Sequence, residues 1–186
     1  MRHLIVPALM LAATALPLAA QGTARFAPSG RGTSTVELMR PEGDPDTTTK
    51  VIRLDWGQPH LRGRTLHTDS LVPLGQVWRA GANGTTTLHT DFMVMFGNHH
   101  LPAGRYALFT LPAQDGWQLI LQRDIGQTIA DYDAGKDVAL VPMRHRAMAT
   151  PVEGLTMLLI PATSGLRGEL RILWGAHELT TEWSAM

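Results

Sequence analysis

Apolar and polar residues alternate with a period of two along most of the chain from Thr33 onward. That period is typical of half-buried β-strands and not of helices. Segment 50–56, KVIRLDW, therefore predicts a strand in which three apolar side chains share one face: Ile52, Leu54 and Trp56. A longer strand is predicted over 88–96, with one face formed by Leu88, Thr90, Phe92, Val94 and Phe96.

Seven further segments have the same character: 33–40, 105–111, 116–124, 137–143, 155–161, 169–175 and 177–183. Turn signals separate them at intervals of roughly 8–12 residues, and no segment predicts a long amphipathic helix. Gly97-Asn98 predicts a tight two-residue hairpin turn. Segment 124–136 interrupts the alternation and predicts a helical turn. About nine strands of this kind indicate an antiparallel β-sandwich, with a partly closed β-barrel as the alternative.

The first twenty residues predict a secretory signal peptide. Arg2 precedes an uncharged apolar run that ends at the small residues Ala19 and Ala20, which favours cleavage after Ala20. Pro7 and Pro17 and the shortness of the run argue against the alternative, an uncleaved membrane anchor. We therefore expect a signal peptide (1–20), a flexible leader (21–32) and a single β domain (33–184) that is periplasmic or secreted.

Composition and charge exclude several classes of function. The chain has no cysteine, which excludes disulfides, thiolate zinc sites, cysteine nucleophiles and a lipoprotein anchor. It has 16 basic and 16 acidic side chains without a basic cluster, which makes nucleic acid and anionic membrane surfaces poor partners. No later segment is long and apolar enough to predict a membrane span.

The longest irregular stretch, 57–84, contains the candidate ligand-binding residues: Arg62, Arg64, Trp78, Arg79 and Asn83. Guanidinium groups suit a carboxylate, a phosphate or a sulfated sugar, and an indole can stack on a sugar ring. In the alternative interpretation these residues build the loop. Val77 and Trp78 then fill the core, Arg79 donates to loop carbonyls and Asn83 caps a turn. The length of the loop favours this alternative, because so long a loop must satisfy its own backbone.

Other candidate chemistry is weak. His89 and Asp91 share a predicted strand face and could ligate a metal together, but no histidine spacing is typical of a metal site, so we predict none. Ser70, Asp69 and His67 are the residue types of a hydrolytic triad, yet the chain has no G-x-S-x-G elbow. The methionines are interpreted as flexible fillers of the core: Met93, Met95, Met143, Met148 and Met157.

Several motifs together resemble the bacterial family called domain of unknown function 2911: RGR (62–64), LVPLGQVWRAGAN (71–83), LPAGRYALFTLP (101–112), Trp117 and YDAGKDV (132–138). The resemblance covers about 33–183 and implies a small exported β domain, with no activity attached. Two positions depart from it. Gly84 stands where the family usually has an acidic residue, and WGQPHLRGR replaces a Tyr-Ser-Arg-Pro-like stretch.

These observations predict a non-catalytic binding or scaffold module of the cell envelope, without a cofactor. Its partner would be a small molecule, a glycan or an envelope protein. The alternative is an envelope hydrolase that acts on an anionic or glycan substrate through the arginine-rich loop 62–84. The sequence does not choose the ligand, since a fold alone does not determine function.

Overall fold

The computed structural model describes residues 26–39, 42–46, 48–68, 71–113, 116–123, 126 and 129–186. The predicted signal peptide and residues 21–25 of the predicted leader lie outside these residues. Within them the chain forms strands and two short 3-10 helices: β1 (Gly30–Leu38), β2 (Lys50–Gln58), β3 (Thr87–Thr90), β4 (Val94–Phe96), β5 (His99–Leu101), β6 (Gly104–Ala113), β7 (Gly116–Gln122), η1 (Ile129–Asp131), η2 (Ala134–Lys136), β8 (Asp137–Pro161) and β9 (Arg167–Ala185).

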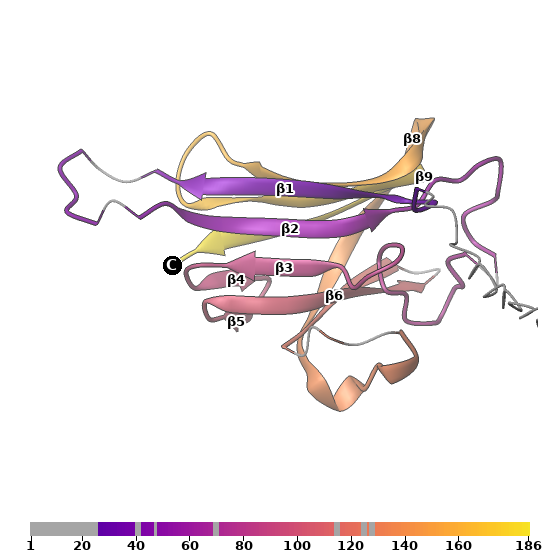
Figure 1. Cartoon of the computed structure of the whole chain (residues 1–186), viewed down its shortest axis with the longest axis horizontal. Helices are drawn as coiled ribbons and strands as arrows, with labels where there is room; N and C mark the ends of the chain where they lie inside the picture. Colours follow the sequence, from indigo (N-terminus) through magenta and orange to yellow (C-terminus); the bar gives the residue numbers. More distant parts are fainter. Residues whose placement is uncertain are drawn as a thin grey trace, which may run out of the picture.

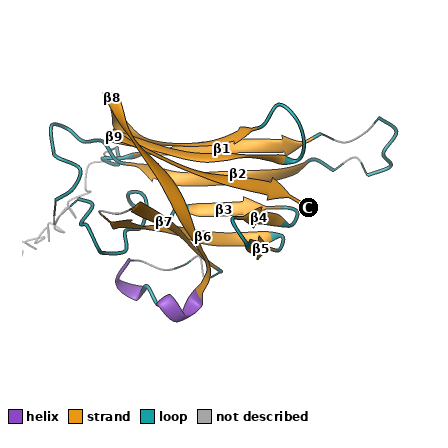
Figure 2. Cartoon of the chain, turned by 180° about the vertical axis from the view of Figure 1, so that it is seen from behind, coloured by secondary structure: helices purple, strands orange, loops and turns teal. Residues whose placement is uncertain are grey.

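All of these strands pair antiparallel in one nine-stranded sheet, in the order β1-β2-β3-β6-β7-β8-β9-β4-β5. Strands β1, β2, β3 and β6 lie side by side, and the β8–β9 hairpin crosses behind β1 and β2 (Figures 1 and 2). The chain after β2 meets β8 at an isolated bridge between His60 and Gly154, and the Leu159 N–H donates to Ser34 Oγ. The predicted all-β antiparallel fold is therefore confirmed, and its two layers are parts of one sheet that curls over itself.

The core lies between these two layers. Ile52, Leu54 and Trp56 of β2 are buried, as the alternation predicted. They belong to one cluster with residues of the β8–β9 hairpin: Leu155, Met157, Leu159, Leu170, Ile172 and Trp174. Trp56 also donates its indole N–H to the carbonyl of Leu155 at 3.0 Å, which satisfies the polar edge of a buried ring. Apolar burial thus fixes the hairpin against the face of β2.

The prediction of one continuous strand over 88–96 was wrong. The chain pairs with β2 and β6 as β3, leaves the ladder at 91–93, and pairs with β5 and β9 as β4. Side-chain bonds hold this corner, because Thr90 Oγ1 donates to the Phe92 carbonyl and Asp91 accepts the Val51 N–H. Burial alternates from Leu88 to Thr90 and again from Val94 to Phe96, whereas Asp91 and Phe92 at the corner are both half-buried.

The four strands predicted after residue 136 are two. Strand β8 contains both 137–143 and 155–161, and β9 contains both 169–175 and 177–183. Residues 144–154, between the two predicted segments, remain extended as part of β8, and the β8–β9 register shifts on either side of Val152. In β9 the corresponding bend is at Gly175, which has a φ of 56°. The predicted turn between segments 169–175 and 177–183 is therefore a bend within one strand, and glycine tolerates the positive φ of that bend.

The predicted hairpin turn and the predicted helical turns are confirmed. Phe96 pairs with His99 across Gly97-Asn98, and Gly97 has the positive φ of 56° that the turn requires. Val94 is fully buried, whereas Phe92 is half-buried against the core. The 3-10 helices η1 and η2 occupy the end of segment 124–136, where Tyr132 packs on Phe109 at the outer face of β6.

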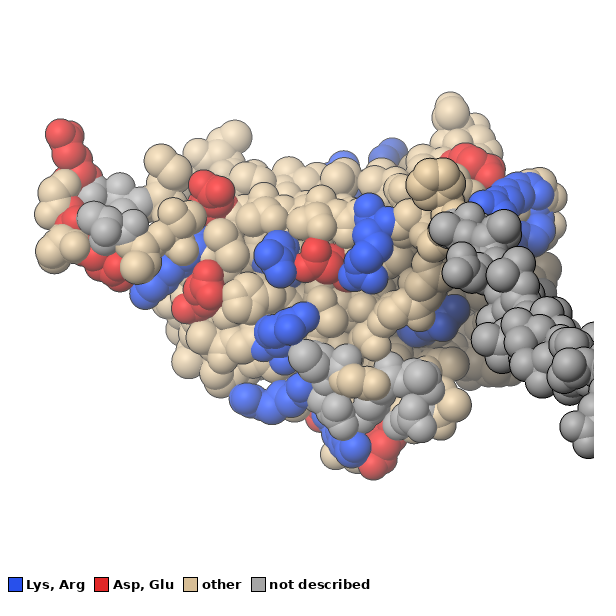
Figure 3. Space-filling view, viewed as in Figure 1, with Lys and Arg blue, Asp and Glu red and all other residues tan. Residues whose placement is uncertain are grey.

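The outer face of β1, β2, β3 and β6 carries charges of both signs (Figure 3). Arg53 on β2 forms an ion pair with Asp55 at 2.8 Å, and register places His89 of β3 between Arg53 and Arg105. Such interspersed charges create no strong field of one sign, in agreement with a formal net charge of zero.

Candidate functional site

The loop between β2 and β3 lies along the edge of β6. Three pairs of residues are joined there by backbone hydrogen bonds: Gly75 with Pro112, Trp78 with Thr110, and Thr86 with Leu108. Strand β3 covers only the first residues of β6, so the loop continues the pairing where β3 has not yet begun. An exposed strand edge is a template for unwanted association, and this loop covers it.

Four of the five candidate ligand-binding side chains donate to backbone carbonyls. Arg79 Nε donates to Gly81 at 3.1 Å, and its Nη1 lies 3.5 Å from the Asn83 carbonyl. The remaining donors act in the same way, as Arg64 bonds His60 and Leu61, Arg62 bonds Pro28, and Asn83 bonds Ser29. Arg79 makes the predicted bonds to loop carbonyls, whereas Asn83 joins the loop to the residues before β1 and does not cap its own turn.

The loop backbone is held in an uncommon conformation. Arg62, Ala80 and Asn83 all have a positive φ, between 50° and 62°. Close approach also requires glycine at Gly57, where a Cβ would lie 1.7 Å from the carbonyl oxygen of Ala82. By contrast, a Cβ at Gly84 would lie 3.6 Å from Nη1 of Arg31, so an acidic side chain there could pair with Arg31.

Trp78 connects this loop to a cluster of tryptophans and histidines. Its ring stacks on Trp174 with centroids 5.5 Å apart, and both line a small recess with Trp117 and His177. The recess measures about 10 Å³, which is barely the space of one water molecule. Trp78 is thus a packing residue at the edge of the core, as the architectural interpretation predicted.

Three histidines from separate segments meet beside this recess. His145 Nε2 lies 3.0 Å from His177 Nδ1, and the rings of His67 and His177 meet edge to face at 4.7 Å. The pKa of His177 is below its ordinary value, chiefly because of burial and also because His67 and His145 would add positive charge beside it. His67 is oriented by a bond between its Nδ1 and the Val72 carbonyl at 3.2 Å. Sequence spacing had not predicted this cluster.

No group of three or more metal-ligating side chains in the described part of the chain has the geometry to hold a metal ion. The predicted pairing of His89 with Asp91 exists, at 2.8 Å. Asp91 also accepts the Val51 N–H at 2.9 Å, which is the main cause of its lowered pKa. This carboxylate therefore serves the corner after β3. Asp69 and Ser70, which suggested a triad with His67, lie outside the described residues.

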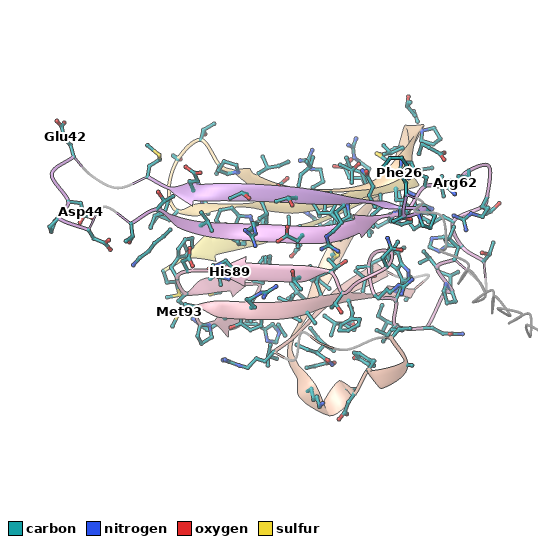
Figure 4. All side chains as sticks on the ribbon, viewed as in Figure 1. Phe26, Glu42, Asp44, Arg62, His89 and Met93 are labelled. Atoms are coloured by element: carbon teal, nitrogen blue, oxygen red, sulfur yellow. The ribbon has the colours of Figure 1, made fainter. Side chains whose placement is uncertain are left out.

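A groove of about 600 Å³ lies at the other end of the molecule, beside the turn of the β8–β9 hairpin. Figure 4 shows the two ends, with Arg62 at one and Met93 at the other. The groove has a mixed lining that includes Met95, Arg167, Glu169, Glu182 and Trp183. A slot of about 360 Å³ adjoins it and is lined mainly by apolar residues, among them Val36, Leu38, Met39, Phe92 and Leu166. Trp183 and Arg167 line both.

The groove was not predicted, because its residues come from β4, β8, β9 and the turns beside them and carry no motif. Its methionines were a usable signal. Met143 and Met157 are buried, as predicted for core fillers, but Met93 is 40% exposed and Met95 lines the groove. Two methionines that depart from the core prediction therefore lie at this end of the molecule.

Comparison with known proteins identifies a family but no activity. The family model described as "Protein of unknown function (DUF2911)" matches residues 42–182. Neither the curated proteins nor the solved structures include a match to this chain. In the described residues no helix has the length and apolar character needed to cross a membrane. The match covers most of the chain, and the protein therefore belongs to the DUF2911 family of proteins of unknown function.

Proposed function

We propose that this protein is an exported, non-catalytic binding module whose ligand occupies the groove beside the β8–β9 turn. The observation that carries the proposal is the groove itself. Its volume of about 600 Å³ falls in the range of small-molecule sites, roughly 300–1,000 Å³. It also combines apolar walls with a few polar groups, which is the usual composition of such sites.

The loop 62–84 is the weaker place for a ligand. Its arginines and Asn83 already donate to backbone carbonyls, and a ligand would have to replace those bonds. The recess beneath Trp78 is too small for anything larger than a water molecule. A ligand in the groove displaces only solvent, so binding there leaves the contacts of the loop intact.

The groove also favours binding over hydrolysis. Glu169 and Glu182, its two carboxylates, both lie 3.5 Å from Arg144 Nη2, and Glu169 also pairs with Arg171 at 2.7 Å. An ion-paired carboxylate is a poor proton acceptor, and the residues that line the groove include no histidine to act as a base. A nucleophile activated by a neighbouring base, the requirement for acyl or glycosyl transfer, is not assembled there.

A thermal-shift screen of the purified chain without residues 1–20 tests the proposal. The panel contains envelope glycans, amphiphiles, small anions and divalent metals. A ligand at a hundred times its Kd should raise the free energy of unfolding by about 2.7 kcal/mol. Ala162 is exposed and lines the groove, so the indole of an Ala162→Trp variant should fill the groove. The stabilisation by the ligand should then disappear in this variant.

Ala176→Trp is the matched control. Ala176 lies on β9 and is exposed, as Ala162 is, but it lines neither the groove nor the slot. It should respond to the ligand like the wild type. Equal stabilisation of the Ala162→Trp variant would place the ligand elsewhere and contradict the proposal. Recovery of a chemically changed ligand by mass spectrometry would contradict the non-catalytic part.

A further inference from the structure

We infer that the ligand is a single-chain amphiphile with an anionic head, of which a long-chain carboxylate is the simplest example. This inference rests on the proposed function and names the chemistry of the ligand. The apolar chain would lie in the slot between the end of β1 and the β8–β9 turn, and the head would lie at Arg167, where the slot meets the groove.

The slot suits an apolar chain. Val36 and Leu38 of β1 form one wall, Phe92 lies at the corner after β3, and Pro161 and Leu166 flank the turn. Met39 and Leu166, which also line it, are 85% and 57% exposed, and the nearby Met93 and Met186 share a backbone hydrogen bond and are exposed too. Flexible methionines around an apolar opening adapt to chains of different shape.

The charges at the junction favour an anion. Arg167 is exposed, and within the described residues its guanidinium has no hydrogen-bond or ion-pair partner. Arginine binds carboxylate and phosphate oxygens through two parallel N–H donors. Glu169 and Glu182 are already paired with Arg144, so they do not compete for Arg167. Glu37 in the slot is the competing charge, and it would attract a cationic head instead.

Trp183 supplies a second observation. Its side chain lines both the groove and the slot and is 5% exposed, and its indole N–H has no acceptor among the described residues. The ring packs against Gly168, another groove residue, where a Cβ would lie 2.5 Å from Cζ2 and 2.8 Å from Cε2 of Trp183. A buried donor without an acceptor is costly, and a head-group oxygen at this position would accept it.

Isothermal titration of the chain without residues 1–20, below the micellar concentration of each ligand, tests the inference. From octanoate to dodecanoate, affinity should rise about fourfold for each methylene, which corresponds to about 0.8 kcal/mol. Dodecanoate should bind more tightly than dodecanol and dodecyltrimethylammonium. Arg167→Gln should weaken dodecanoate binding about tenfold and leave dodecanol unchanged. Arg62→Gln, at the far end of the molecule, is the matched control and should change neither.

Three outcomes overturn the inference. Tighter binding of the cationic amphiphile would make Glu37 the partner of the head and leave the proposed function standing. The second outcome is that no amphiphile binds, whereas a different ligand binds and Ala162→Trp abolishes its binding. This result would overturn the inference and also leave the proposed function standing. Dodecanoate binding that survives Ala162→Trp unchanged would overturn both the inference and the proposed function, because the ligand would then lie outside the groove.

Discussion

The ring of Trp78 stacks on the ring of Trp174 with centroids 5.5 Å apart and planes 17° from parallel. Trp78 exchanges backbone hydrogen bonds with Thr110 of β6, and the indole N–H of Trp174 donates to the Glu153 carbonyl of β8. One stacked pair therefore joins the long loop to β6, β8 and β9. This pairing anchors a loop that contains little regular structure to the core.

Truncation of Trp78 should destabilise the protein. The ring is half-buried against the core, so we expect Trp78→Ala to lower the free energy of unfolding by about 2–3 kcal/mol, less than the 3–5 kcal/mol typical of a fully buried tryptophan. Urea denaturation measures this change. Leu74→Ala, an exposed apolar truncation in the same loop, is the control and should change stability by less than about 0.5 kcal/mol.

Loss of Arg79 should also destabilise the protein, by about 1–2 kcal/mol, because the carbonyls of Gly81 and Asn83 would lose a charged donor. The double variant Trp78→Ala/Arg79→Ala should be less destabilised than the sum of the single variants, since both changes release the same loop. Strict additivity in urea denaturation would show that the stacked pair and the arginine act on separate parts of the loop.

The histidine cluster predicts a loss of stability in mild acid. Burial and the neighbouring His67 and His145 lower the pKa of His177 below its value of 6.5 in an unfolded chain. The unfolded state therefore binds more protons than the folded state as pH falls below 6.5, and the free energy of unfolding must fall over that range. Above this range His177 is neutral in both states and contributes no slope.

His177→Gln should flatten this slope below about pH 6.5, measured by urea denaturation at several pH values. Asp91 does not interfere, because its lowered pKa makes a contribution that is lost only in more acidic solution, below its ordinary value of 3.8. His100→Gln, an exposed histidine on β5, should retain the wild-type slope. The same slope in the His177 variant would assign the acid sensitivity to other groups.

The period of two in the sequence predicted the fold class and the buried face of β2, because alternation reports directly which side chains leave water. It could not predict where a strand changes partners. Residues 88–96 alternate without interruption, yet the side chains of Thr90 and Asp91 turn the chain from one part of the sheet to another. The two halves of β8 were separated by a polar stretch that turned out to be an exposed, bent part of one strand.

The sequence indicated the loop more clearly than the groove, because a sequence pattern reports on neighbouring residues and not on segments that meet only after folding. A loop is contiguous, so Trp78 and Arg79 could be interpreted together. The groove forms only when β4, the end of β8 and both ends of β9 meet. Gly168 and Trp183, which line it, come into contact although most of the length of β9 separates them. Histidines 67, 145 and 177 likewise meet only in the folded chain.

The predicted export also has a direct test. The apolar run that ends at Ala19-Ala20 predicts cleavage before Gln21. The full chain produced in a bacterial host should appear in the periplasm or the medium with Gln21 or a near neighbour as its first residue, measured by intact-mass spectrometry. A form that keeps Met1 and sediments with membranes would show that the run is an anchor instead.

The turn between β4 and β5 offers the sharpest test of backbone conformation. Gly97 has a φ of 56°, and a Cβ there would lie 3.4 Å from Cγ1 of Val141. That distance is an ordinary contact, but the positive φ strains a β-branched residue, so Gly97→Val should lower the free energy of unfolding by about 1–3 kcal/mol.

Gly97→Asn is the matched comparison, because asparagine adopts a positive φ more easily than other residues with a Cβ. It should lose less than half as much stability as Gly97→Val in the same urea titration. Strand β4 pairs with the end of β9 beside the groove, so Gly97→Val should also lower the affinity for any ligand that binds in the groove. Equal stabilities of the two variants would mean that crowding at Val141, and not the positive φ, determines which residue this turn accepts.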